Sequence, residues 1–305
     1  QAGYANTTGT ENFFGGYLAG ATATTGGYGT FVGSRAGNAA VTGNYNTALG
    51  YYAYGSGSSG ANNVAIGAQA LYLNTTASNN TAVGYQALQA NTTASNNTAV
   101  GWNAMYSNTT GANSVAIGYQ ALVNNTTATY NIAIGHQALY SNTTGAVNHG
   151  IGAAAGFNIT TGTYNICIGY NAGYTTTPIT TGSRNYIFGD YSYPSASAGT
   201  DQIVIGYNLA GKGNNTAYIS ANGGATYNGK NITTWDTVSD RRIKKNIVDN
   251  NDGLEKITSI RVRNFEYRLP DEVDAELKPT DAVEKSGVQL GVIAQELQQV
   301  LPECV

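Results

Sequence analysis

A serine and a lysine late in the chain carry the side chains best suited to covalent chemistry. Ser239 and Lys244 lie five residues apart in the segment SDRRIKKNI, residues 239–247. A serine hydroxyl attacks a carbonyl only when a base takes its proton, and lysine is such a base only when its pKa is lowered. The other basic residues of this segment would lower that pKa, because nearby positive charge disfavours the ammonium form. The spacing alone assigns no role to either residue.

Carboxylates are missing from the middle of the chain. Residues 36–183 contain no Asp, Glu, Lys or Arg, whereas glycoside cleavage generally needs two carboxyl groups about 5–10 Å apart. The carboxylates before residue 239 are scattered towards the two ends, at Glu11, Asp190, Asp201 and Asp236. We therefore expect no enzyme activity in residues 1–238.

The composition argues against metal, cofactor, nucleic-acid and membrane functions. Two cysteines, Cys167 and Cys304, are too few for a disulfide framework or a cysteine-based zinc site, and His136 and His149 are isolated. No apolar run approaches the roughly 18 residues of a membrane span. A formal net charge of −3 does not suit a surface for nucleic acid. We expect no cofactor, no metal site, no nucleic-acid partner and no membrane insertion.

The charged residues divide the chain near Ser239. Residues 1–238 carry eight charged side chains that sum to zero, and residues 239–305 carry the other 23. Glycine follows the opposite trend, with 37 of its 40 occurrences before residue 239. Two kinds of protein are therefore joined here. Because the chain begins with Gln1, we expect a piece of a longer polypeptide or a processed one.

A glycine recurs about every 17 residues through the first part of the chain. The glycines of this series are Gly15, Gly33, Gly50, Gly67, Gly84, Gly101, Gly118, Gly135, Gly152, Gly169, Gly189 and Gly206. The clearest unit is NTAVGYQALQANTTASN, residues 80–96. So short a unit cannot fold alone and has no helix-length periodic run, so it suits one coil of a β-solenoid. We predict 12 coils over residues 1–206, then a neck or cap over 207–238.

The residues before each glycine predict a short strand. The residue directly before the glycine is apolar in every unit, the next one back is usually Ala, and the third is mostly Thr, Val or Ile. This alternation is typical of a strand with two different faces. We expect the bulky face to point into the core and the alanine face to meet a close neighbour. Cys167 occupies an alanine position, so we expect a buried and unreactive thiol.

Two other repeat positions are candidates for corners or ligand contacts. Asn-Thr-Thr runs begin at Asn74, Asn91, Asn108, Asn125 and Asn142. They match a glycosylation sequon, but we interpret them as corners whose stacked asparagines hydrogen-bond from coil to coil. The residue after the glycine is often aromatic, and Tyr85, Trp102 and Tyr119 are candidate glycan-binding residues. The alternative is that these rings brace corners or fill gaps between chains.

Several units have a recognisable sequence, notably NNVAIG (62–67), NTAVG (80–84) and NSVAIG (113–118). They resemble the head repeats of trimeric autotransporter adhesins and related repeats in phage tail fibres. The resemblance covers about residues 12–206. It implies a parallel β-roll in which three chains lie side by side, with small residues near the three-fold axis.

The charged tail, residues 239–305, is predicted to be a small α+β unit. The patterns favour a short helix at 252–260, a strand at 261–268, and a helix at 290–301 with Ile293, Leu297 and Val300 on one face. The motifs SDRRIKKNI, FEYR and GVIAQELQQVLPECV resemble the intramolecular chaperone domain of endosialidases and other phage tail spikes and fibres. This second resemblance covers residues 237–305.

The second resemblance implies a domain that trimerises, drives assembly of the fibre stem and then cuts itself off before the serine of its SD motif. Carried over, the scissile bond is Val238–Ser239, with Ser239 as nucleophile and Lys244 as its base. Asp240 would orient or stabilise the site. The chain would then be at most a single-turnover serine autoprotease. Members of that family continue into long C-terminal helices, whereas this sequence stops at Val305. Either the domain is truncated here, or the chain departs from the family in the part that would trimerise and cleave.

Together the patterns predict a mostly β protein, a trimeric parallel β-solenoid followed by a small α+β chaperone domain. We expect the structural and host-recognition fibre of a virion, a phage tail fibre that is extracellular after release. The expected partners are further copies of the chain, other tail or fibre proteins, and a glycan or protein receptor on a bacterial surface. The alternatives are a bacterial surface adhesin, and a polysaccharide-degrading tailspike whose enzyme domain lies outside this chain.

Overall fold

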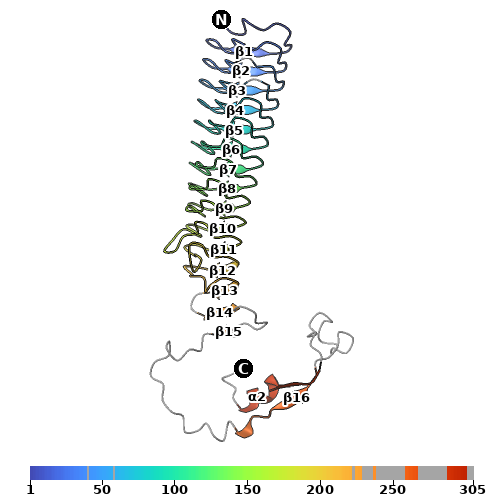
Figure 1. Ribbon diagram of the computed structural model, residues 1–305, viewed down its shortest axis with the longest axis vertical. Helices are drawn as coiled ribbons and strands as arrows, with labels where there is room; N and C mark the ends of the chain where they lie inside the picture. Colours follow the sequence, from blue (N-terminus) through green and yellow to red (C-terminus); the bar gives the residue numbers. More distant parts are fainter. Residues whose placement is uncertain are drawn as a thin grey trace. The chain divides into compact units, whose positions relative to one another are not determined.

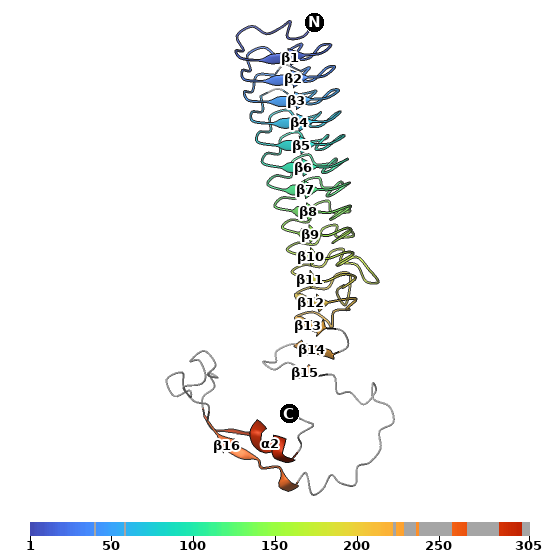
Figure 2. The ribbon, with the colours of Figure 1, turned by 180° about the vertical axis from the view of Figure 1, so that it is seen from behind.

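The chain divides into two compact units, Gln1–Val238 and Ser239–Val305. The structure, a computed structural model, describes residues 1–39, 41–57, 59–221, 224–228, 236–237, 258–266 and 287–300. The first unit is a regular stack of similar coils with one short strand in each, seen in Figure 1 and from behind in Figure 2.

The first unit is a parallel β-solenoid whose strands β1–β13 pair in chain order. The strands are β1 Phe13–Gly15, β2 Thr30–Val32, β3 Thr47–Leu49, β4 Val64–Ile66, β5 Thr81–Val83, β6 Thr98–Val100, β7 Val115–Ile117, β8 Ile132–Ile134, β9 His149–Ile151, β10 Ile166–Ile168, β11 Tyr186–Phe188, β12 Gln202–Gly206 and β13 Thr216–Ala221. The sheet ends in two antiparallel strands, β14 Gly224–Asn228 and β15 Asp236–Thr237. The predicted fold class, a mostly β protein built on a parallel β-solenoid of 17-residue coils, is confirmed.

A glycine ends each of the central strands because the next coil comes too close for a side chain. At Gly84 the φ angle is 135°, and an added Cβ would lie 2.3 Å from the carbonyl oxygen of Gly101. In the first coil this corner glycine is Gly16, since β1 pairs with β2 so that Gly15 lies opposite Val32. Beginning the series at Gly15 was therefore wrong, and the spacing of 17 holds from Gly16 to Gly169.

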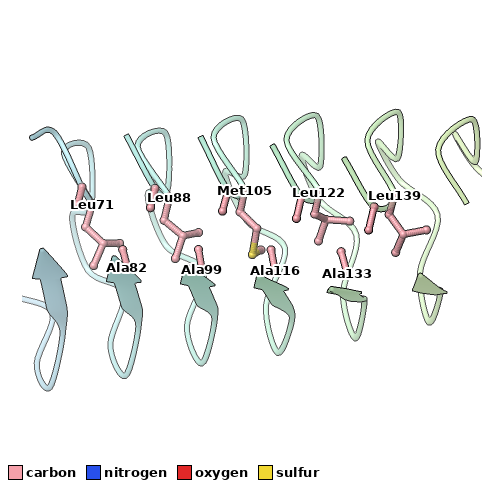
Figure 3. Packing of buried hydrophobic residues seen from close by; sticks show 14 of the residues in the cluster. Leu71, Ala82, Leu88, Ala99, Met105, Ala116, Leu122, Ala133 and Leu139 are labelled. Carbon is pink, nitrogen blue, oxygen red and sulfur yellow. The ribbon is translucent and has the colours of Figure 1, made fainter. Parts of the chain in front are cut away.

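The strands turn their middle residue inward, which reverses the predicted orientation of the two faces. Ala82 in β5 is fully buried, whereas Thr81 and Val83 on either side of it are half-buried. Figure 3 shows Leu88 and its equivalents reaching across the coil towards the strand alanines. These leucines are fully buried and belong to one core cluster with the alanines. The bulky strand residues face outward because the opposite wall already fills the narrow interior.

Three combinations of residues fill the interior of a coil. In the central coils a Leu or Met from the opposite wall packs over a strand alanine, and these residues are Leu71, Leu88, Met105, Leu122 and Leu139. In the second coil Phe31 projects from the strand instead, and the facing residue is Gly37, where an added Cβ would lie 2.2 Å from the ring. In a third arrangement Gly156 takes the leucine position and Ile159 fills the space, with its Cδ1 3.0 Å from an added Cβ. Each coil therefore conserves volume by exchanging which wall supplies the large side chain.

Buried asparagines form two columns along the interior. In the Asn-Thr-Thr column, Asn91 donates to Oδ1 of Asn74 at 2.8 Å and to the carbonyl of Ala94 at 2.9 Å. In the second column, just before the strands, the backbone N–H of Asn80 donates to Oδ1 of Asn63 at 3.0 Å. These bonds satisfy polar groups that water cannot reach. The prediction that the Asn-Thr-Thr runs are corners bonded from coil to coil is confirmed.

Residues other than glycine adopt left-handed conformations at three positions of the repeat. In one coil they are Gln86 (φ 54°), Leu88 (φ 50°) and Asn96 (φ 63°). Each such residue costs roughly 1–2 kcal/mol relative to a right-handed conformation. Bonds to neighbouring coils offset that cost, for the N–H groups of Gln86 and Leu88 donate to Ala68 and Ala104, both at 3.0 Å. These corners have no glycine signature, so the sequence did not predict them.

The described residues of the second unit form a hairpin-like pair of strands and a helix. They are β16 Arg263–Phe265, its antiparallel partner β17 Gln289–Gly291, and α2 Ala294–Val300. The strand predicted at 261–268 is confirmed over 263–265. The helix predicted at 290–301 begins later because residues 289–291 pair with β16. The helix predicted at 252–260 lies mostly outside the described residues.

The face predicted for the last helix agrees with its exposure. Ile293, Leu297 and Val300 are half-buried, whereas Gln298 and Gln299 are exposed. Within the described ranges, no helix combines the length and the apolar character that crossing a membrane requires.

Candidate functional site

The predicted cleavage residues Val238, Ser239, Asp240 and Lys244 lie outside the described residues. The described chain reaches Thr237 in β15, which lies opposite Thr226 of β14 at the end of the sheet. The assignment of nucleophile, base and scissile bond therefore stays a prediction. No three His, Cys, Asp or Glu side chains come together as a metal site in the part of the chain that the structure describes.

One ion pair in the second unit joins the strand pair to the helix. Arg263 of β16 donates through Nε and Nη2 to the two carboxylate oxygens of Glu296 in α2, at 3.0 and 2.8 Å. The hydrogen bond from Arg263 lowers the pKa of the Glu296 carboxyl below its usual value. Both side chains remain partly exposed, so the pair fixes the orientation of the helix more than it stabilises the fold.

The residues that follow the corner glycines form a column on the outside of the solenoid, here called the outer column. Its members are Tyr17, Ser34, Tyr51, Ala68, Tyr85, Trp102, Tyr119, His136, Ala153, Tyr170, Asp190 and Tyr207. Backbone bonds hold successive members in line. The carbonyl of Tyr85 accepts from Asn103, and the carbonyl of Trp102 accepts from Gln120, both at 2.9 Å.

The three candidate glycan-binding residues lie together in one stack of rings. Tyr85 and Trp102 have ring centres 6.0 Å apart, and Trp102 and Tyr119 have ring centres 4.9 Å apart, with interplanar angles of 16° and 7°. His136 continues the stack, 5.1 Å beyond Tyr119. The faces of the middle rings are therefore occupied by neighbouring rings, and only their edges remain for a sugar. This packing favours the alternative that the rings brace the corner, and the glycan-binding role stays a prediction.

Small residues interrupt the outer column at Ser34, Ala68 and Ala153. Rings beside the first gap are more exposed than those in the stack, since Tyr17 is 65% and Tyr51 54% exposed against 41% for Trp102. The sequence analysis did not predict these gaps, because it considered only the units in which an aromatic residue follows the glycine. The signal is present in the sequence as the small residue at an otherwise aromatic position.

The outward residues at the end of each strand form an apolar strip along the solenoid, here called the strand face. Its exposed members in and around the central coils are Leu49, Ile117, Ile134, Ile151, Ile168 and Ile205, each 36–47% exposed. A contiguous apolar strip on a surface marks an interaction site. The sequence analysis placed these residues in the core, so their exposure was not predicted.

Comparison with known proteins gives a match for the second unit only. A family model described as the chaperone of endosialidase matches residues 239–305. Searches of curated proteins and of solved structures found no significant match. A β-solenoid followed by this chaperone fits a trimerised fibre or a tailspike-like protein.

Proposed function

We propose that this chain is a host-recognition fibre of a virion, a phage tail fibre. The C-terminal chaperone assembles the fibre into a trimer and is then released by autocleavage. One observation carries the proposal. The chaperone match begins at residue 239, two residues after β15 ends a solenoid with an apolar outer strip. A chaperone that assembles a fibre stem needs a stem with such a surface next to it.

The strand face supports assembly of identical copies. Its isoleucines are part-exposed in the single chain, and burying apolar surface stabilises an assembly by about 25 cal/mol per Å². Copies packed in register place the same residue at the same level, so any charge there would face its like. Residues 36–183 carry no charge, which removes that repulsion over most of the solenoid.

The proposed cleavage uses only groups of this chain and water. Lys244 takes the proton from Ser239 Oγ, and the oxygen attacks the carbonyl carbon of Val238. The bond between that carbon and the Ser239 nitrogen breaks, the nitrogen takes up a proton, and an ester links Val238 to Ser239 Oγ. Water then hydrolyses the ester, leaving a carboxylate on Val238 and a free amine and hydroxyl on Ser239. Asp240 orients or stabilises this site.

The test is the intact mass of the full-length protein beside a Ser239→Ala variant. We expect two fragments that meet between Val238 and Ser239 in the wild type, and one uncut chain in the variant. The control is Ser259→Ala, which replaces another serine of the same unit and should cleave normally. An uncut wild-type chain would show that the second unit is a permanent cap or an assembly aid without proteolysis.

A further inference from the structure

The gap at Ser34 lies between two exposed tyrosines. The backbone N–H of Arg35 donates to the carbonyl of Tyr17 at 2.8 Å, and that of Tyr52 donates to the carbonyl of Ser34 at 3.1 Å. Tyr17, Ser34 and Tyr51 therefore occupy the same corner of three consecutive coils. Neighbouring coils lie about 4.8 Å apart, so the two tyrosines begin about 10 Å apart, which leaves room for one more ring.

The tyrosines beside this gap do not stack on other rings of the outer column. Tyr17 takes part in none of the ring contacts found among the described residues, and it is 65% exposed. Tyr51 meets Tyr52 edge to face, with ring centres 4.7 Å apart, and is 54% exposed. Rings that are stacked in the column, such as Trp102 and Tyr119, are 41% and 44% exposed. The gap thus offers aromatic surface that the stack does not.

A single cation lies beside this gap. Arg35 is the only charged residue between residues 12 and 183. Its guanidinium donates to the Tyr52 hydroxyl and lies 5.2 Å from the centre of that ring. By contrast Arg184, on another corner, is bonded to both carboxylate oxygens of Asp201 at 2.6 and 2.9 Å. Arg35 therefore has donors left for an external anion, and a carboxylate matches their geometry.

A second copy of this chain is a poor source of that anion. The neighbouring coils contain one carboxylate, Glu11, which holds the repeat position of Tyr28 and Tyr45 before the strand. A copy packed in register therefore places no carboxylate at the repeat position of Ser34 and Arg35. Burying an unpaired guanidinium between copies would cost free energy. These two facts favour a corner that faces solvent in the assembled fibre.

We propose that Tyr17, Ser34, Arg35 and Tyr51 form a slot that binds a carboxylate-bearing sugar of a cell-surface polysaccharide. The sugar ring lies between the two tyrosines, and its carboxylate accepts hydrogen bonds from Arg35. The inference rests on the proposed host-recognition function and names the class of ligand. It also moves the binding site away from the ring stack at Tyr85, Trp102 and Tyr119.

The probe is an array of oligosaccharides that contain hexuronic or sialic acids, each beside the same molecule with its carboxyl group reduced to an alcohol. We expect the full-length fibre to bind at least one acidic member, and to bind it at least about tenfold more tightly than its reduced form. That factor corresponds to one hydrogen bond between charged groups. Equal binding of every acidic and reduced pair, or no binding to any acidic member, would overturn the inference.

Two variants locate the binding. Arg35→Gln should lose the preference for the acidic member by about tenfold or more. Ser34→Tyr should abolish binding without unfolding the coil, because the new ring fills the slot between Tyr17 and Tyr51. The matched controls are Arg184→Gln, which removes an arginine elsewhere, and Ala153→Tyr, which fills a distant gap. Unchanged binding in either slot variant contradicts the proposal.

Two further readouts separate this inference from the proposed function. If both slot variants attach to host cells as the wild type does, the slot is not the receptor site, while the fibre function stands. If the wild type does not attach to cells, the proposed function fails, and the oligosaccharide array still tests the slot. If light scattering gives Ser34→Tyr a mass below that of a trimer, a neighbouring chain occupies the slot, which also overturns the inference.

Discussion

At the scale of single residues, one asparagine links three successive coils. Asn108 donates to Oδ1 of Asn91 at 3.0 Å and to the carbonyl of Gly111 at 2.9 Å, and it accepts from Asn125 at 2.7 Å. We expect Asn108→Ala to lower the free energy of unfolding by about 2–4 kcal/mol, because it leaves buried groups on both sides without partners. Denaturant unfolding followed by circular dichroism measures this loss.

Thr93→Ala is the matched control for that change. Thr93 is the exposed third residue of an Asn-Thr-Thr corner, and its replacement should alter the free energy of unfolding by no more than about 0.5 kcal/mol. Equal losses in the two variants would show that the asparagine column does not stabilise the solenoid.

The buried thiol of Cys167 gives the stability a dependence on alkaline pH. Burial raises the pKa of Cys167 from 9.0 to about 12. Between these values the unfolded thiol loses its proton while the folded one keeps it, so the folded state loses stability as pH rises. Relative to Cys167→Ala, we expect the wild type to lose about 1.4 kcal/mol between about pH 8 and pH 10.

The measurement is denaturant unfolding of both proteins at the two pH values. Alanine is a fair replacement, since it holds the equivalent strand position in β3–β8. A parallel decline of the two proteins would mean that Cys167 is accessible to water in the folded state.

At the scale of the element, the side chains that fill the interior of one coil are matched in size to one another. Gly156 and Ile159 together replace the leucine and asparagine of the common coil. We expect Gly156→Leu alone to cost about 1–3 kcal/mol through overpacking against Ile159 and Leu139. Combined with Ile159→Asn, it should cost less than the sum of the two single changes by about 1 kcal/mol or more.

A double-mutant cycle of unfolding free energies tests this coupling. The backbone can accept the new side chain, because Gly156 (φ 63°) and Leu88 (φ 50°) have similar conformations. Strictly additive losses would contradict the idea that the two positions exchange volume.

The sequence predicted the coil but not which strand face is inside. The corner at Gly84 was predictable because its spacing and neighbours repeat, and a Cβ there would collide with Gly101. The inward position of Ala82 depends on Leu88 reaching across from the other wall. That is a property of the closed coil, and a strand pattern shows only that the two faces differ.

The same limit applied to the candidate site. The rings at Tyr85, Trp102 and Tyr119 were identifiable from the repeat, but their mutual stacking depends on distances between coils. The gap at Ser34 is defined by its neighbours Tyr17 and Tyr51, which are distant in sequence from one another. Arg35 was visible as an isolated charge, yet its tyrosine surroundings appear only once the coils are stacked.

At the scale of the whole molecule, the strand face should control assembly. Ile134 is 37% exposed in the single chain, so Ile134→Lys should leave the coil folded and prevent trimer formation, because the ammonium would be buried between copies. We expect light scattering to give a single-chain mass for this variant and a trimer mass for the wild type, with unchanged circular dichroism.

Thr127→Lys provides the control on another side of the solenoid, where the side chain is exposed. It should remain trimeric. A wild-type mass of one or two chains would refute the trimer itself, and a trimeric Ile134→Lys variant would place the interface on some other surface.

Because the coils stack in one register, mutations that remove or add a whole coil can change the length of the fibre. Each central strand bonds only to the strands directly before and after it. Loss of residues 81–97 would join Asn80 to Thr98 and recreate the junction that the chain already uses at both places. The rod would shorten by one rung of about 4.8 Å, and the strand pairing and both asparagine columns would keep their partner types. Replication slippage or unequal recombination within the gene could therefore change the length of the solenoid by whole coils while the remaining coils keep their strand pairing.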